Sequence, residues 1–113
     1  MKCSKIALVI AAIAMPAFAL ANACTSIQCT ATIKQIVVGN GDNIQVQLQI
    51  TQADEDLLNC TLASDTYFTL VSGDTRFDQI YSGLLSAQVR RAQVEFRILE
   101  GSNNCEILYV RLM

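Results

Sequence analysis

The sequence contains no histidine, no tryptophan and one proline, and charged side chains make up only 16% of its residues. Without histidine it lacks the side chain that most often serves as a general acid or base near neutral pH and that most often binds catalytic zinc. It also lacks a C-x-x-C redox motif, because four residues separate Cys24 from Cys29. No serine is paired with a recognisable base. The sequence therefore predicts a protein that is not an enzyme, with no catalytic residue, no cofactor and no metal ion.

The first residues have the pattern of a bacterial signal peptide. Lys2 and Lys5 form a positively charged start, and residues 6–14 (IALVIAAIA) form an apolar core that is too short to span a membrane. Residues 21–23 (ANA) then match the A-x-A pattern of a cleavage site. We expect a secreted or periplasmic protein without stable membrane insertion.

The cleavage position has alternatives. Cleavage after Ala19 or Ala21 fits the same rule, but the preferred position is after Ala23, which predicts a signal peptide over 1–23 and a single domain over 24–113. A lipoprotein is the competing interpretation, because Cys24 follows a small residue. The residues at positions 21 and 22 do not match the leucine and small residue expected there, so a soluble form is favoured.

Removal of the signal peptide also removes Cys3 and leaves four cysteines: Cys24, Cys29, Cys60 and Cys105. An even number in an exported domain of this size predicts disulfides, which small domains use to supplement a modest core. Three connectivities are open. We favour Cys60 with Cys105, which closes a long loop and should stabilise the fold by about 2–4 kcal/mol, and a local bridge between Cys24 and Cys29.

The charge balance argues against nucleic acid as a partner. The full sequence has a formal net charge of -2, and loss of Lys2 and Lys5 would take it to -4. An acidic domain is repelled by a phosphate backbone.

The first half of the domain has the alternation of β-strands. An apolar run over 31–38 is followed by turn residues at 39–42 and by a strictly alternating run over 44–50. In that second run Gln45, Gln47 and Gln49 face away from the core. Such a face could bind a ligand, but a solvated strand face is the favoured interpretation.

The alternation of apolar and polar residues then ends, and a third strand follows. Residues 54–56 (DED) predict an exposed loop, and a calcium site is disfavoured because the spacing and the glycine of calcium loops are missing. Residues 66–71 (TYFTLV) are rich in β-branched and aromatic side chains and predict the third strand.

Residues 77–90 have the spacing of one amphipathic helix, with Asp74 or Thr75 as the predicted N-cap. The side predicted to face outward carries small residues where lysine and glutamate are usual, which suggests packing against another copy. The candidate residues of this oligomer interface are Ser82, Gly83, Ser86 and Ala87. A tolerant surface without a partner is an equal alternative. Two further strands are predicted over 93–98 and 105–113.

Five short strands with one helix between the third and fourth match the order of the OB-fold, a small Greek-key barrel that binds oligonucleotides or oligosaccharides. The predicted fold class is therefore mainly β, with an OB-like five-stranded barrel. An open α+β sheet covered by one helix is the rival, because periodicity alone does not distinguish the two.

The region over 44–98 resembles the B subunits of subtilase cytotoxin and of pertussis-like AB5 toxins. It shares a cysteine-containing segment, an F-x-x-x-Y helix with small residues, and a following V-x-I-type strand. The residues that carry the resemblance are Cys60, Phe77, Tyr81, Leu84, Leu85, Ala87, Val94, Phe96 and Ile98.

The resemblance implies an OB-fold that assembles as a pentamer, with its helices around a central pore, and a surface that binds host glycans, often sialylated. The glycan-contacting serine of that family lies just before its first strand and aligns here with Cys29. Ser26 and Thr30 lie nearby but do not match the motif, so no ligand-binding residue is carried over.

Two functional hypotheses follow. The first is a secreted or periplasmic non-catalytic binding module of the toxin B-subunit type, oligomeric and glycan-binding. The alternative is a monomeric, disulfide-stabilised periplasmic domain that binds another protein or has a structural role.

Overall fold

The computed structural model describes residues 22–39 and 41–113. The predicted signal peptide lies outside these residues, apart from Asn22 and Ala23. The elements are β1 (Gln28–Val37), β2 (Ile44–Leu48), α2 (Gln52–Leu57), β3 (Phe68–Leu70), α3 (Phe77–Arg90), β4 (Gln93–Ile98) and β5 (Ile107–Leu112). The predicted fold class is confirmed: the chain is mainly β, with five strands and a helix between the third and fourth.

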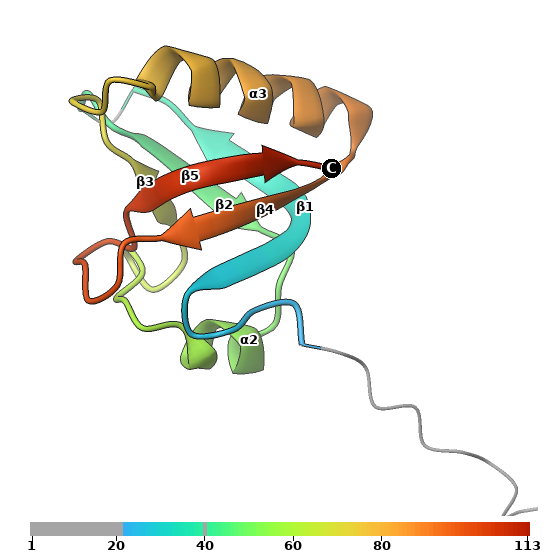
Figure 1. Ribbon diagram of the computed structural model, residues 1–113, viewed down its shortest axis with the longest axis vertical. Coiled ribbons are helices and arrows are strands. Elements are labelled where there is room, and N and C mark those ends of the chain that lie inside the picture. The colour runs from blue at the N-terminus through green and yellow to red at the C-terminus, as the bar shows by residue number, and fades with distance from the viewer. Residues whose placement is uncertain (1–21, 40) are drawn as a thin grey trace, which may run out of the picture.

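The strands form one antiparallel sheet in the order β3-β2-β1-β4-β5, which curls until its two outer strands meet (Figure 1). Thr69 of β3 forms a parallel bridge with Glu106, just before β5, and the Thr69 N–H donates to the Cys105 carbonyl at 3.1 Å. These contacts join β3 to β5 and close the sheet. The result is the closed OB-like barrel rather than the open sheet.

Strand β1 contributes to both halves of the barrel. Its first residues, from Gln28 to Thr32, pair with β4, and its last residues, from Ile33 to Val37, pair with β2. The pairing is irregular between Ile33 and Gln35. An extra residue of this kind bends a strand and increases its twist, so β1 can turn from one half of the sheet to the other.

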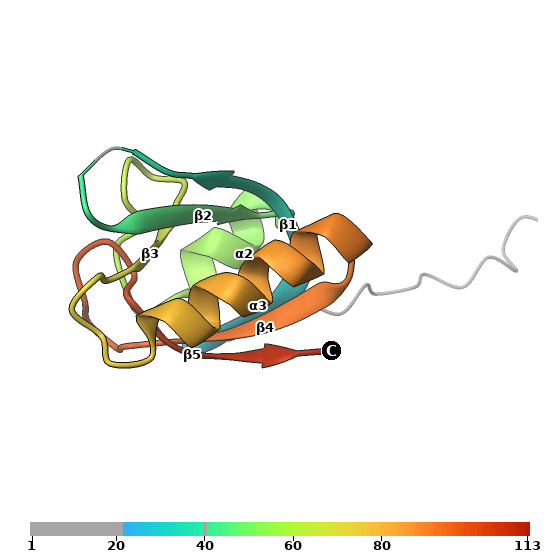
Figure 2. The same cartoon turned by 90° about the horizontal axis from the view of Figure 1, so that it is seen from above.

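Helix α3 lies across one end of the strands (Figures 1 and 2). Leu84 and Ala87 are its fully buried residues, and they extend the apolar core inside the barrel. At the centre of that core the rings of Phe68 and Phe96 meet edge to face, with centroids 5.3 Å apart. The helix therefore closes one end of the barrel core (Figure 1).

The start of α3 differs from the prediction. Its N-cap is Arg76, without a side-chain cap, so the predicted N-caps Asp74 and Thr75 lie outside the helix. The Asp74 carboxylate instead accepts from the Arg76 N–H at 2.8 Å in the turn before the helix. At the other end Arg91 takes the left-handed conformation, with φ at 55°, and its N–H donates to the carbonyls of Ala87 and Gln88.

The predicted exposed loop over 54–56 was wrong. These residues belong to α2, whose start is fixed by a capping box between Thr51 and Asp54. Asp54 is buried, because the chain at Ala23 folds over it. Aspartate at this position replaces the glutamate or glutamine of the usual sequence signature, and this is why the helix was missed.

Disulfides join Cys60 to Cys105 and Cys24 to Cys29, the pairing favoured among the three open connectivities. The long bridge ties the segment before β3 to the start of β5, next to the point where the barrel closes. Both bonds are consistent with an oxidising, extracytoplasmic compartment. Within 22–39 and 41–113, no helix is both long and apolar enough to cross a membrane.

Candidate functional site

The outer surface of β1, β2 and β3 carries neutral polar side chains that the strands bring side by side. The alternation of β2 places Ile44, Val46 and Leu48 in the core and turns Gln45 and Gln47 outward. The neighbouring strands and the residue just before β3 add amide, phenol and hydroxyl groups. We call this surface the glutamine face and define it as Gln35, Gln45, Gln47, Tyr67 and Thr69.

The register of the strands determines which of these residues are neighbours. Gln35 is paired with Gln47 across β1 and β2, and Gln45 is paired with Thr69 across β2 and β3. Tyr67 directly precedes Phe68, whose partner is Val46, so Tyr67 lies beside Gln47. The Gln35 amide nitrogen donates to the Tyr67 hydroxyl at 2.8 Å. This bond connects residues that are 32 positions apart in the sequence.

The chemistry of the glutamine face is that of neutral hydrogen bonding. Each glutamine side chain offers an amide N–H₂ and a carbonyl oxygen, and a tyrosine hydroxyl can both donate and accept. None of the five residues carries a charge at neutral pH. Such a surface matches a ligand with many hydroxyl groups, which also donate and accept, better than it matches an ion.

Thr69 forms the base of this surface rather than a contact point. Its side chain is 4% exposed, and its hydroxyl oxygen has no hydrogen-bond partner among the described residues. A buried hydroxyl without a partner costs about 1–3 kcal/mol. Among the described residues, the only other buried side-chain atom of this kind is Nε of Arg97, on a different face.

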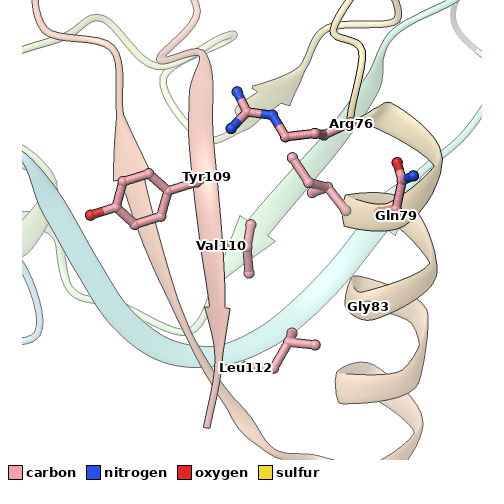
Figure 3. Close-up of a pocket in the computed structure, with 7 residues that line it drawn as sticks. Arg76, Gln79, Gly83, Tyr109, Val110 and Leu112 are labelled. Atoms are coloured by element: carbon pink, nitrogen blue, oxygen red, sulfur yellow. The ribbon is translucent and has the colours of Figure 1, made fainter.

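The outer surface of β4 and β5 is also polar but carries charges. We call it the charged face and define it as Glu95, Arg97, Tyr109 and Arg111. Arg97 is paired with Tyr109, and Glu95 with Arg111. Arg111 Nε lies 3.5 Å from a Glu95 carboxylate oxygen, with the two side chains 65% and 13% exposed. The Tyr109 ring points away from α3, on the opposite side of β5 from Val110 (Figure 3).

The predicted oligomer interface is only partly on the outside of α3. Ala87 is fully buried in the core, and a Cβ added to Gly83 would meet the Leu112 side chain at 3.1 Å. The outward placement of Ala87 was therefore wrong, and Gly83 is half-buried because Leu112 of β5 packs against that side of the helix. Ser82 and Ser86 are exposed as predicted. Leu85 and Val89 accompany them and are 39% and 83% exposed.

A hollow of about 210 Å³ lies between α3 and β5 (Figure 3). Its apolar lining includes Ile80, Gly83, Val110 and Leu112, and Arg76 and Gln79 stand on the helix side. Arg76 is 3.5 Å from Asp74, so its charge already has a partner. The hollow resembles a gap in the packing of the helix more than a site with convergent polar groups.

A second hollow, of about 420 Å³, lies beside α2 and is acidic, with Glu55, Asp56 and Asp65 among its lining residues. Burial raises the pKa of Glu55, and repulsion from Asp56 and Asp65 raises it further. In the part of the chain that the structure describes, no three histidine, cysteine, aspartate or glutamate side chains are placed to hold a metal ion.

The position aligned with the toxin family's glycan-contacting serine is closed. Cys29 is fully buried in its disulfide, while Ser26 is exposed and Thr30 is half-buried. The alternation of β2 predicts the outward direction of Gln45 and Gln47, but it does not predict their neighbours Gln35, Tyr67 and Thr69. The signal for these residues lies in the pairing of distant strands, which no local pattern contains.

The chain was also compared with known proteins. No family model, no curated protein and no solved structure matches it.

Proposed function

We propose that the protein is an exported, non-catalytic binding module of the toxin B-subunit type that recognises carbohydrate through the glutamine face. The observation that carries the proposal is the meeting of Gln35, Gln47 and Tyr67, from separate parts of the chain, on one neutral surface. The two disulfides support export, and the predicted signal peptide supplies the route.

The fold supports this location. OB-fold proteins bind oligosaccharides or oligonucleotides on the face formed around their second and third strands. Here β2 and the chain at β3 supply Gln45, Gln47 and Tyr67. An oligonucleotide is disfavoured on the same face, because the net charge is negative and none of the five residues is cationic.

The amide groups also suit a sugar in their geometry. Residues on neighbouring strands lie close enough for adjacent hydroxyl groups of one sugar ring to reach both. The phenol of Tyr67 can pack its apolar ring against the ring hydrogens of a sugar while its hydroxyl stays bonded to Gln35. Gln35 and Tyr67 thus hold each other in place, which lowers the entropy cost of binding.

A glycan array probed with the disulfide-bonded domain tests the proposal. The wild type should bind a defined set of glycans, and Gln47→Ala should bind the same set more weakly, because it removes the amide between Gln35 and Tyr67. Gln93→Ala is the matched control, since Gln93 is an exposed glutamine on β4, away from the glutamine face. Absence of any glycan signal for a folded wild type would refute carbohydrate recognition.

The assembly is a second part of the proposal. The outward face of α3 presents Ser82, Leu85, Ser86 and Val89, a set without charge. The resemblance to pentameric toxin subunits favours another copy of the same chain as the partner, with the small residues allowing close approach of two helices.

Light scattering after gel filtration tests this assembly separately from glycan binding. The wild type should be larger than a monomer, and Val89→Glu should shift it toward the monomer while leaving the core intact. Gln93→Glu introduces the same charge on β4 and should not change the size. A monomeric wild type at micromolar concentration would exclude the oligomer without bearing on the glutamine face.

A further inference from the structure

Ala23, the last residue of the predicted signal peptide, is built into the fold. The Ala23 N–H donates to Oδ1 of Asp54 at 3.0 Å, and the Ala23 carbonyl accepts from the Thr30 N–H at 2.9 Å. The Ala23 side chain packs against the core. Ala23 therefore connects two distant segments, the start of α2 and the start of β1.

The Asp54 carboxylate depends on this connection. Asp54 as a residue is 5% exposed, and the second carboxylate oxygen accepts from the Thr51 N–H at 3.1 Å and from the Thr51 hydroxyl at 2.9 Å. Burial alone raises the pKa of Asp54, but the hydrogen bonds from Thr51, Ala23 and Cys24 outweigh burial and hold this pKa below its ordinary value. A buried anion of this kind is stable only while its donors are present.

The Cys24 sulfur already forms a disulfide bond. It is bonded to Cys29, and the residue is 2% exposed. Lipidation of an exported protein attaches the lipid to the sulfur of the first cysteine through a thioether. One sulfur atom cannot hold a disulfide and a thioether together, so this fold does not accommodate a lipid on Cys24.

We propose that the leader is removed between Ala21 and Asn22, so that the mature chain begins at Asn22 and keeps Ala23. In this step water adds across the peptide bond: Ala21 leaves with the new carboxylate, and Asn22 keeps the new amino group. Ala19 and Ala21 supply the small residues that a signal peptidase needs at the third and first positions before the bond.

Cleavage after Ala23, the position preferred from the sequence alone, would remove two of these contacts. Asp54 would lose the Ala23 N–H, and the Thr30 N–H would lose its acceptor. The new amino group of Cys24 could still donate to Asp54, but nothing would replace the lost carbonyl at Thr30.

Mass spectrometry of the protein exported from a bacterial host identifies the cleaved bond. Trypsin releases the N-terminal peptide at Lys34, the first lysine or arginine after the leader, so the start of the mature chain is read even from a variant that does not fold. The peptide should begin at Asn22. A peptide that begins at Cys24, a lipid-modified Cys24 or a chain that keeps its leader would each overturn the proposal.

Two variants sharpen the test. Ala19→Tyr removes the small residue needed for cleavage after Ala21 but leaves the requirements for cleavage after Ala23 intact, so we expect the Asn22 peptide to disappear. Ala23→Leu blocks only cleavage after Ala23, so we expect processing to continue at Asn22. The opposite pattern would show that the bond after Ala23 is the one cleaved.

Discussion

The glutamine face and the charged face are both polar surfaces of one barrel, but they differ in how their hydrogen-bonding capacity is used. On the charged face Glu95 is largely covered and has Arg111 as its partner. On the glutamine face the side-chain hydrogen bond from Gln35 to Tyr67 uses a single amide hydrogen. The amides of Gln45 and Gln47 have no side-chain partner among the described residues. The difference shows where the barrel can offer neutral groups to a ligand.

The charged residues of this protein differ in burial, and they therefore differ in how much they contribute to stability. The Arg111 side chain of the Glu95–Arg111 pair is exposed, so water screens the pair, and such pairs contribute little to stability. Asp54 is a carboxylate that the fold buries and surrounds with donors. The buried Asp54 carboxylate therefore stabilises the fold more than the charges on the outer surface of the barrel do.

The largest change in the free energy of unfolding is expected when Asp54 is replaced. Asp54→Asn replaces an anion that accepts several hydrogen bonds with a neutral amide, and it should lower the free energy of unfolding by about 2 kcal/mol at neutral pH. Urea titrations of both proteins measure this loss. An unchanged midpoint would contradict the role of Asp54 as a buried anchor.

The same carboxylate predicts a pH dependence. Because the pKa of Asp54 is lower in the folded protein than in the unfolded chain, its stabilisation is complete above the ordinary aspartate range. It should be lost as the pH falls through that range toward the lower pKa of the folded state. The difference between wild type and Asp54→Asn should therefore shrink in acid, and a difference that grows would contradict the direction of the shift.

The next largest change in the free energy of unfolding is expected when Thr69, at the base of the glutamine face, is replaced. Thr69→Val replaces a buried, unpartnered hydroxyl with a methyl group of similar size, and it should raise the free energy of unfolding by about 1 kcal/mol. Thermal unfolding followed by circular dichroism measures the gain. A loss of stability would mean that the Thr69 hydroxyl has a role in the folded protein.

The smallest effect is expected on the charged face. Arg111→Gln removes the partner of Glu95 and should change the free energy of unfolding by about 0.5 kcal/mol or less. Urea titrations at low and high salt should give a small difference that shrinks as salt screens the pair. A loss as large as that of Asp54→Asn would mean that this pair is held far more rigidly than its exposure suggests.

The sequence predicts β2 and α3 well because each of these elements has its own periodicity, whereas α2 was missed because Asp54 departs from the usual capping signature. The alternation around Gln45 and Gln47 identifies β2 and its outward face, and the helical spacing after Phe77 identifies α3. The remaining features depend on contacts between distant residues. Gly83 is half-buried because Leu112 packs against it, and Asp54 is buried because Ala23 folds over it.

The glutamine face likewise combines features that follow from local periodicity with features that depend on contacts between distant residues. The direction of Gln45 follows from a period of two, whereas its neighbour Thr69 follows from the pairing of β2 with β3. The meeting of Gln35 with Tyr67 depends on the irregular pairing in β1, which shifts the register by a residue before Gln35. A one-residue change of register reverses the faces of a strand, so no local pattern could have placed these two side chains together.

Calorimetric titration of the best array glycan into two matched double variants tests the central claim most directly. Gln45→Ala with Gln47→Ala removes two of the neutral amides, and Glu95→Gln with Arg111→Gln removes the ion pair of the charged face and leaves Arg97 in place. We predict that the first pair weakens binding at least about tenfold, a loss of about 1.4 kcal/mol, and that the second pair leaves binding unchanged. Loss of binding in the second pair but not in the first would contradict recognition by the glutamine face.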